Sequence, residues 1–310
     1  MSSPAPLVSV IIPTQRRPEG LEIAVRSVIA QVGIADFELV VVDNDQVPSA
    51  RAAVEELARS APFACTYVHE PVAGVANARN AALANARGQF MAFLDDDEEA
   101  PSHWLAALLA AQAQFDADVV FGPVRGRAPA EVGPHRAYLE WFYSRFGPKE
   151  AGPIPSYFGC GDSLIRRTAL PNPAEPFSAT RNHTGGEDDL LFGQMKARGA
   201  RFAWAPEAWV WEDPLPQRLT LNYALRRALG YGQGPTQACA AQSPPNIPGI
   251  VRWMAVGMAQ AMAFGILAGV KRLTGSADYA FALDRAVRGL GKVLWWGPFR
   301  LHFYGQNAPS

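Results

Sequence analysis

Short apolar runs alternate with helix-patterned segments through residue 122, and this alternation restricts the chain to few folds. Runs that suit buried strands occupy residues 7–12, 37–43, 65–68, 90–94 and 119–122. Segments with helical spacing of apolar residues separate them, at about 19–30, 49–60, 74–86 and 102–115. The alternation predicts an α/β fold with a mainly parallel sheet and helices on both faces. We expect Pro13 to end the first strand.

The apolar run Phe90–Leu94 ends in five consecutive acidic residues, 95–99. Like charges about 4 Å apart repel by roughly 4 kcal/mol near a protein surface. A divalent cation relieves such repulsion, and an all-oxygen cluster suits Mg²⁺ or Mn²⁺ better than zinc. The carboxyl ends of strands are also where open α/β sheets bind ligands. The alternative is a solvated acidic loop before the next helix.

Two further groups of acidic residues lie at the end of a predicted strand or at the start of a predicted helix. The second strand ends at Asp43 and Asp45. A glycine pair at 185–186 precedes the acids 187–189, which open a predicted helix that runs to Gly199. Acids in a first helical turn interact favourably with the helix dipole, which explains one or two of them but not three.

Composition excludes several classes of protein. The 28 basic and 29 acidic residues nearly balance, so the chain shows no nucleic-acid footprint. The three cysteines are scattered without CxxC spacing, which argues against a disulfide framework and a zinc site and fits a reducing cytosol. The first residues lack the basic start and apolar run of a signal peptide.

The pattern changes after Pro123. Residues 125–160 are rich in proline, glycine and aromatic residues, and Trp141 lies in an aromatic group that either stacks on sugar or fills a core. Further strands are predicted at 163–166 and 202–210. A helix from about Leu219 carries Arg226 and Arg227.

The C-terminal part contains an apolar segment, 253–270, without a formal charge and with basic residues on both sides. Its length is just enough to span a membrane. Its Gln260 and three glycines oppose insertion, so we expect a helix that lies in the membrane interface or packs on the sheet. A second segment, 290–300, mixes tryptophan with basic residues, as membrane-surface segments do, although a core helix is the alternative for both.

Five motifs between residues 7 and 230 together resemble the inverting family 2 glycosyltransferases of GT-A fold. They are Pro13-Thr14, Asp43, Ala78-Arg79-Asn80, Asp95-Asp96-Asp97 and Gly186-Glu187-Asp188. Residues 43–50, 93–98 and 104–105 resemble a bacterial branch typified by the succinoglycan β-1,4-glucosyltransferase, which extends a lipid-linked oligosaccharide. The resemblance implies a Rossmann-like mixed, mainly parallel sheet flanked by helices.

The resemblance also implies roles for residues on the side of the nucleotide sugar. The loop after the first strand would contact the nucleotide, and the second strand end would accept hydrogen bonds from uracil or ribose. Arg79 would pair with the diphosphate or with Asp95, and Asp96 with the sugar. The implied nucleotide-sugar residues are Pro13, Thr14, Arg16, Asp43, Asp45, Arg79, Asp95 and Asp96.

The metal and the base follow from the same resemblance. Asp97, with Asp95, would hold Mn²⁺ or Mg²⁺, which neutralises charge on the leaving nucleoside diphosphate. Many relatives add a histidine ligand where this chain has Glu212, so Glu212 or water would take that place. Asp188 would be the general base, with Asp189 as second candidate and Glu187 on hydroxyls of the sugar or the saccharide acceptor.

The chain lacks the Gln-x-x-Arg-Trp motif of processive relatives, which favours the addition of one sugar. Diphosphate or lipid phosphate contacts are assigned to Arg218, Arg226 and Arg227, with a solvated helix face as alternative, and Trp141 to the acceptor.

The implied activity is metal-dependent, inverting transfer of one hexose, glucose from UDP-glucose, to a lipid-linked saccharide in bacterial exopolysaccharide biosynthesis. A catalytic domain would cover 1–240, with a nucleotide-sugar half at 7–123 and an acceptor half at 124–240. Residues 241–310 would be helical and associated with the cytoplasmic face of the inner membrane. The alternatives are a non-catalytic scaffold of a polysaccharide assembly and a sugar-nucleotide nucleotidyltransferase.

Overall fold

The computed structural model describes residues 5–182 and 186–299, which form two compact units. The first unit comprises residues up to Arg125 together with Ser144–Asp213. The second comprises Gly126–Tyr143 and the described residues from Pro214 onward. These units follow other boundaries than the predicted functional division at 123 and 240, which stays a prediction.

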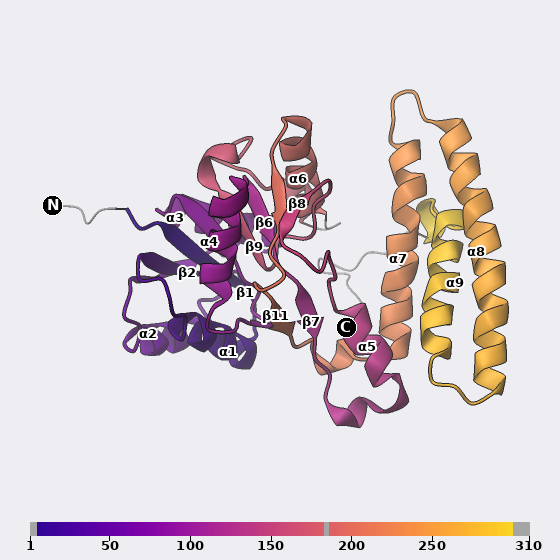
Figure 1. Ribbon diagram of the computed structural model, residues 1–310, viewed down its shortest axis with the longest axis horizontal. Helices are drawn as coiled ribbons and strands as arrows, with labels where there is room; N and C mark the ends of the chain where they lie inside the picture. Colours follow the sequence, from indigo (N-terminus) through magenta and orange to yellow (C-terminus); the bar gives the residue numbers. More distant parts are fainter. Residues whose placement is uncertain (1–4, 183–185, 300–310) are drawn as a thin grey trace. The chain divides into compact units, whose positions relative to one another are not determined.

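An eight-stranded sheet forms the centre of the first unit, in the order β3-β2-β1-β4-β9-β6-β10-β8 (Figure 1). Its strands are β1 Val8–Thr14, β2 Phe37–Asp43, β3 Cys65–His69, β4 Phe90–Phe93, β6 Val119–Phe121, β8 Gly152–Ile154, β9 Ser163–Arg166 and β10 Phe202–Trp204. The pairs β1–β2, β2–β3, β1–β4 and β6–β10 are parallel. Strand β9 is antiparallel to β4 and β6, and β8 to β10. The predicted mixed, mainly parallel sheet is confirmed.

Helices cover both faces of this sheet because its central strands bury apolar side chains on both sides. Val8, Val10 and Ile12 of β1 enter one core cluster, and Ile11 enters the other. The first cluster contains residues of α1 Pro18–Ile29, α2 Arg51–Ala58 and α4 Trp104–Phe115. The second contains residues of α3 Val75–Asn85 and α6 Glu187–Ala197.

Strand β1 continues through Pro13, so the prediction that Pro13 ends the strand was wrong. Pro13 pairs in register with Val42 of β2. Strand β4 pairs with β1 only as far as Ile11, whose carbonyl accepts from the Leu94 amide. Thr14 bonds toward β2, so Pro13 turns toward the side that β4 has already left. Its missing N–H therefore costs no ladder hydrogen bond.

A second sheet has the order β5-β11-β7, with β5 Glu98–Glu99, β11 Val210–Glu212 and β7 Val124–Gly126. The prediction of one strand over 202–210 was wrong. The chain leaves the large sheet after Trp204, passes Pro206, and enters the small sheet at Val210. Proline cannot donate to a ladder, and a change of sheet at this point aligns β11 with the acidic segment at β5.

The second unit is helical, with α5 Arg136–Phe142, α7 Leu221–Ala240, α8 Ile247–Leu273 and α9 Tyr279–Val293. Short 3₁₀ turns lie at Ala130–His135, Pro216–Arg218 and Gly297–Phe299, and others in the first unit at Arg167–Ala169 and Ala179–Arg181. Helix α7 continues through the glycine-rich stretch at 230–234. Glycines permit close helix contacts here, since a Cβ on Gly232 would lie 2.3 Å from the Arg288 carbonyl oxygen of α9.

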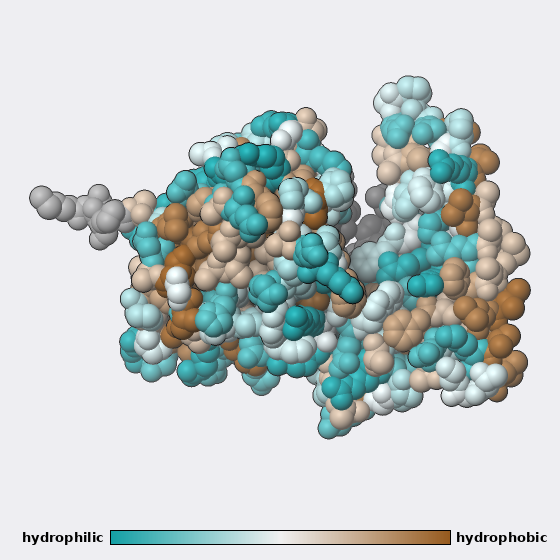
Figure 2. Space-filling model, in the orientation of Figure 1, coloured by the Kyte–Doolittle hydropathy of each residue, from teal (hydrophilic) through white to brown (hydrophobic). Residues whose placement is uncertain are grey.

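Helix α8 packs against α9 and α7 but leaves an apolar face exposed. It is the one helix of the described residues long and apolar enough to cross a membrane, and 11% of that window is buried in the protein. The exposed side chains include Val251, Met262, Ile266 and Leu273. Figure 2 shows hydrophobic colouring along the side of α8 that is turned away from α9. The predicted segment 290–300 spans the end of α9 and the turn after it, and residue 300 lies outside the described part.

Candidate active site

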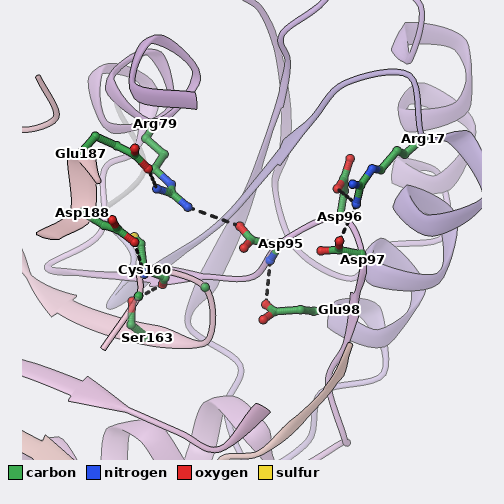
Figure 3. A network of polar contacts seen from close by, with 12 residues as sticks. Arg17, Arg79, Asp95, Asp96, Asp97, Glu98, Cys160, Ser163, Glu187 and Asp188 are labelled. Atoms are coloured by element: carbon green, nitrogen blue, oxygen red, sulfur yellow. Dashed lines mark hydrogen bonds and ion pairs between the residues drawn. The ribbon is translucent and has the colours of Figure 1, made fainter. Parts of the chain in front are cut away.

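The acidic segment after β4 forms one side of a dense polar network in the first unit (Figure 3). Asp95, Asp96 and Asp97 lie between the end of β4 and the short strand β5. Asp96 is buried, and Asp95 and Asp97 are half-buried. The carboxylates after β4 thus lie at the edge of the sheet where open α/β folds bind ligands.

Arg17 holds two of these acids, a role that the sequence analysis missed. Its Nη1 lies 3.1 Å from Asp96 Oδ1 and 2.5 Å from Asp97 Oδ2. Thr14 donates to the other oxygen of Asp96 at 2.8 Å. The neighbouring Arg16 points elsewhere, to Asp45 at 2.7 Å. The paired arginines were the only signal in the sequence, and it does not say which of them meets the cluster.

Arg79 links the acidic segment to the acids of α6. Its guanidinium lies 2.6 Å from Glu187 Oε1 and 3.6 Å from Asp95 Oδ1. The side chains of Arg79 and Glu187 are both more than nine-tenths buried. The contact with Asp95 was among the predicted ones, whereas the bond to Glu187 was not expected. Two predicted motifs, separated by about ninety residues, therefore share one arginine.

Asp188 is held by backbone amides on both of its oxygens. The Cys160 amide donates to Oδ2 at 3.2 Å and the Asp189 amide to Oδ1 at 2.8 Å. Asp188 is half-buried and Asp189 is exposed. The loop that carries Cys160 also borders Asp95, since a Cβ on Gly161 would lie 2.6 Å from Asp95 Oδ2. This loop, 159–162, thus lies beside both Asp95 and Asp188.

Burial raises the pKa values of Asp95, Asp96 and Glu187 in this network. Burial is the main cause for Asp95, although 36% of its side chain stays exposed, and the charges of Asp97 and Asp188 add to it against Arg79. Burial raises the pKa of Asp96 to about 6. The pKa of Glu187 is raised by burial despite Arg79. Two arginines, Arg17 and Arg79, thus contact four acids of the site.

Glu98 does not belong to a solvated acidic loop, which was the alternative for residues 95–99. It is 4% exposed, lies in β5, and its carboxylate accepts from the Asp95 amide at 2.8 Å. Burial, with the charges of Asp95 and Asp162, raises its pKa well above the usual value. The next helix, α4, begins only at Trp104, so Glu98 caps the acidic turn itself.

The end of β2 is organised separately. Asp43 is fully buried and accepts from the Tyr67 hydroxyl at 2.8 Å and the Ala50 amide at 2.7 Å. Asp45 pairs with Arg16, and this hydrogen bond lowers the pKa of Asp45. The predicted nucleotide residues Asp43, Asp45 and Arg16 therefore lie at the ends of β1 and β2, on the side of β1 away from β4.

The proposed third metal ligand, Glu212, lies on β11 opposite Glu98 of β5. The Asp213 amide donates to the Asp97 carbonyl oxygen at 2.8 Å, so this strand borders the acidic turn. Across residues 5–182 and 186–299, no three His, Cys, Asp or Glu side chains form a group arranged to hold a metal. Paired, partly buried carboxylates nevertheless match the oxygen donors that Mg²⁺ and Mn²⁺ prefer.

The predicted acceptor residues all belong to the second unit. Arg227 donates to the Tyr231 hydroxyl at 2.8 Å, and Arg226 is exposed on α7. The Arg218 carbonyl accepts from Tyr143. The Trp141 ring packs 5.4 Å from Phe281. These placements leave their predicted roles untested.

Comparison with protein families matches residues 9–172 to the model described as glycosyl transferase family 2. The succinoglycan biosynthesis protein ExoM of Rhizobium meliloti is 38% identical over 229 residues, which cover 71% of each chain. The family match includes the segment that carries Asp43, Arg79 and the acids 95–97.

A second relative is the Escherichia coli enzyme WfgD, named UDP-Glc:alpha-D-GlcNAc-diphosphoundecaprenol beta-1,3-glucosyltransferase. It is 38% identical over 92 residues, which cover 30% of this chain and 35% of WfgD. Among solved structures, the mannosyltransferase PcManGT of Pyrobaculum calidifontis, in complex with GDP-Man and Mn²⁺, superposes with a TM-score of 0.62. Its sequence identity is 22%, and the match covers 94% of this chain and 88% of that one, which shows a shared fold.

Proposed function

Because the chain belongs to the family 2 glycosyltransferases, we propose that it transfers one hexose, glucose from UDP-glucose, to a lipid-linked saccharide. The observation that carries this proposal is the network in which Arg79 joins Asp95 to Glu187, next to Asp188. In this proposal the acids after β4 would face the leaving diphosphate, and Asp188 would be the base. Bacterial exopolysaccharide synthesis is the proposed setting, as ExoM's name indicates for that relative.

The nucleotide sugar would bind at the two neighbouring strand ends. Pro13 and Thr14 end β1 and Arg16 follows it, while Asp43 ends β2 and Asp45 follows it, as a nucleotide site at the carboxyl edge of a sheet requires. Asp95 and Asp96 would then lie toward the ribose and the sugar. UDP-glucose is proposed because WfgD's name specifies UDP-Glc as the substrate of that enzyme.

The acidic segment fits a divalent cation. Burial raises the pKa of Asp95, and the charge of Asp97 adds to this against Arg79. The carboxylate oxygens suit Mg²⁺ or Mn²⁺. Asp97 and Asp95 would hold the ion, with Glu212 as the candidate third ligand and phosphate oxygens of the substrate filling other positions. Such an ion neutralises charge on the departing diphosphate. Mn²⁺ is named in the PcManGT complex.

Asp188 is the proposed general base. The acceptor hydroxyl oxygen would attack the anomeric carbon while the bond from that carbon to the diphosphate oxygen breaks, with inversion. The proton of the hydroxyl passes to an Asp188 oxygen, and the electron pair of the broken bond leaves with the nucleoside diphosphate. The two amides on Asp188 keep its carboxylate in one orientation. Asp189 remains the second candidate, and Glu187 would act through Arg79.

The second unit is proposed to serve the acceptor and the membrane. Arg218, Arg226 and Arg227 would bind a lipid diphosphate and Trp141 a sugar ring. The exposed apolar face of α8 would lie in the cytoplasmic surface of the inner membrane, because its 27 residues carry basic groups only near the ends. The functional halves at 7–123 and 124–240 and the segment 241–310 belong to this proposal.

The test is metal-dependent release of nucleoside diphosphate from UDP-, GDP- and dTDP-sugars. Membranes with lipid-linked acceptors would be present, and wild type would be compared with Asp188→Asn and Asp189→Asn. We expect turnover with UDP-glucose that Asp188→Asn abolishes and Asp189→Asn largely keeps. The reverse ranking would transfer the role of base to Asp189. No turnover and no nucleotide binding with any sugar donor would overturn the proposal.

Binding to the membrane needs its own test. Liposomes that contain anionic lipid should retain the wild-type protein. A variant with Ile266, Val270 and Leu273 changed to glutamine should bind at least tenfold more weakly, because each exposed apolar side chain adds burial energy in the interface. Equal retention of the two proteins would remove α8 from the proposed contact.

A further inference from the structure

Arg145 makes an unusual set of bonds for a residue outside every predicted motif. Its side chain is 14% exposed. Nε donates to the Gly122 carbonyl at 2.9 Å, and Nη1 donates to the carbonyls of Gly159 at 3.0 Å and Gly161 at 2.8 Å. Nη2 donates to the Asp162 carbonyl at 2.8 Å and lies 3.3 Å from its carboxylate. One guanidinium thus holds the loop 159–162 by its backbone.

The backbone of Arg145 is itself fixed. It forms an antiparallel bridge with Val124, with hydrogen bonds of 2.8 and 3.2 Å. The Arg145 side chain therefore links the loop 159–162 to a backbone segment that is itself hydrogen-bonded to Val124. The fork of the guanidinium suits this task because it presents several donors in one plane.

The peptide group between Gly159 and Cys160 connects Arg145 to Asp188. In a trans peptide the carbonyl and the N–H point in opposite directions. The Gly159 carbonyl accepts from Arg145, and the Cys160 N–H on the opposite side donates to Asp188 Oδ2. A cation that bonds to the carbonyl also polarises the amide and strengthens its donation. Rotation of this peptide would break both bonds at once.

We propose that Arg145 is a positioning residue that orients Asp188 through the Gly159–Cys160 peptide group. It touches neither substrate nor the reacting atoms in this role. By holding the Gly161 carbonyl as well, it keeps the loop backbone against Asp95, where there is no space for a side chain. The loop 159–162 would thereby set the distance between Asp188, the proposed base, and Asp95, which would lie toward the leaving group.

This inference rests on the proposed role of Asp188 as base, so the experiment separates the two. The variants are Arg145→Gln, Arg145→Lys and, as matched control, Arg166→Gln. Arg166 also lies in the first unit and binds a backbone carbonyl and the acids Asp116 and Asp118. It lies at the far end of β9, four residues after the loop, and these partners are not part of the loop. All three are measured as full-length proteins, after a check that their unfolding transitions stay cooperative.

The kinetic readout is the division of the effect between kcat and the KM for UDP-glucose. We expect Arg145→Gln to lower kcat about 100-fold, the cost of misplacing a catalytic group by about 1 Å, with KM within threefold of wild type. Arg145→Lys should lose about tenfold, because one ammonium cannot serve all the carbonyls. Arg166→Gln should keep wild-type kcat. A kcat for Arg145→Gln within twofold of wild type, or an equal loss in the Arg166 control, would overturn the inference.

Hydrogen exchange gives a readout that does not need activity. The Cys160 amide should exchange at least tenfold faster in Arg145→Gln, while the amides of β9 keep their wild-type rates. Unchanged exchange at Cys160 would overturn the inference. A wild-type protein that turns over no sugar donor would overturn the proposed function, and exchange at Cys160 would then decide the role of Arg145 alone.

Discussion

Two strand ends of the same sheet carry clustered acids, and the pKa values of Asp45 at one end and of Asp95 and Asp96 at the other are shifted in opposite directions. At the end of β2, Asp45 pairs with Arg16 and has a lowered pKa, and Asp43 accepts from Tyr67 and a backbone amide. At the end of β4, the pKa values of Asp95 and Asp96 are raised by burial and by neighbouring acids. Similar sequence patterns thus produce different electrostatic environments at the two strand ends.

The difference supports the proposed cation site. Partners at the end of β2 are supplied by the chain itself, so that region can receive a neutral or hydrogen-bonding part of a ligand. The three acids Asp95, Asp96 and Asp97 after β4 share Arg17 and Arg79, and Arg79 also pairs with Glu187. A ligand that brings a cation would relieve the repulsion. Four predictions test this contrast.

The largest effect is expected from Arg79→Gln. The change leaves the buried Glu187 without its ion-pair partner, which costs about 3–5 kcal/mol of unfolding free energy at pH 7. Urea unfolding measures the loss. Arg16→Gln, at the end of β2, removes an arginine that is 69% exposed and should stay within error of wild type. Equal losses in both variants would remove the contrast.

Asp97→Asn tests the same contrast in catalysis. We expect kcat with UDP-glucose and Mn²⁺ to fall about 10²–10³-fold, since the variant removes charge where the diphosphate leaves. Asp45→Asn should act on the KM for UDP-glucose and leave kcat within a few-fold. If Asp45→Asn lowered kcat as much as Asp97→Asn does, both strand ends would have to act in the chemical step.

The pH dependence of stability should differ in sign at the two ends. The pKa of Asp96 is about 6 in the folded protein against 3.8 for the free side chain, so folding binds a proton between these values. Stability contributed by Asp96 is therefore present below about pH 4 and is lost as the pH rises to 6.

The Asp96→Asn variant should not show this loss of stability with rising pH. The difference in unfolding free energy between the variant and wild type should increase by roughly 3 kcal/mol between pH 4 and 7, because each unit of pKa shift corresponds to about 1.4 kcal/mol. Asp45 has a lowered pKa, so its stabilisation is present at neutral pH and is lost on acidification. Urea titrations at four pH values measure both, and a difference that falls with rising pH in Asp96→Asn would contradict the assignment.

The smallest effect concerns Thr14→Val. The variant loses the hydroxyl that donates to Asp96 at 2.8 Å, and we expect about 2 kcal/mol of destabilisation at pH 7. Thr14→Ser keeps the donor and should retain most of the stability. If valine and serine behave alike, the hydroxyl does not stabilise the Asp96 carboxylate.

The strands and helices with regular apolar patterns were predictable from the sequence. Strands β2 and β9 were predicted at their observed bounds. In β2 the apolar run Leu39–Val42 leaves few alternatives to a buried strand. The break between β10 and β11 was not predicted, since it depends on which sheet accepts each half.

The candidate site was predictable in part. Short sequence patterns, acids at a strand end and acids after a glycine pair, were enough to predict the segments 95–97 and 187–189. Arg17, Cys160 and Arg145 were missed. Their partners lie between 14 and 80 residues away along the chain, at separations that no local pattern encodes.

The sequence alone determined the alternation of strands and helices, the family, and the places where carboxylates leave the sheet. These follow from local periodicity and from motifs a few residues long. Only the tertiary structure decided that Arg17 rather than Arg16 meets the acidic turn, that Arg79 joins Asp95 to Glu187, and that Glu98 is buried. The physical reason is that a charged side chain takes its partner and its pKa from whatever packing brings within a few ångströms, and that packing joins distant parts of the chain.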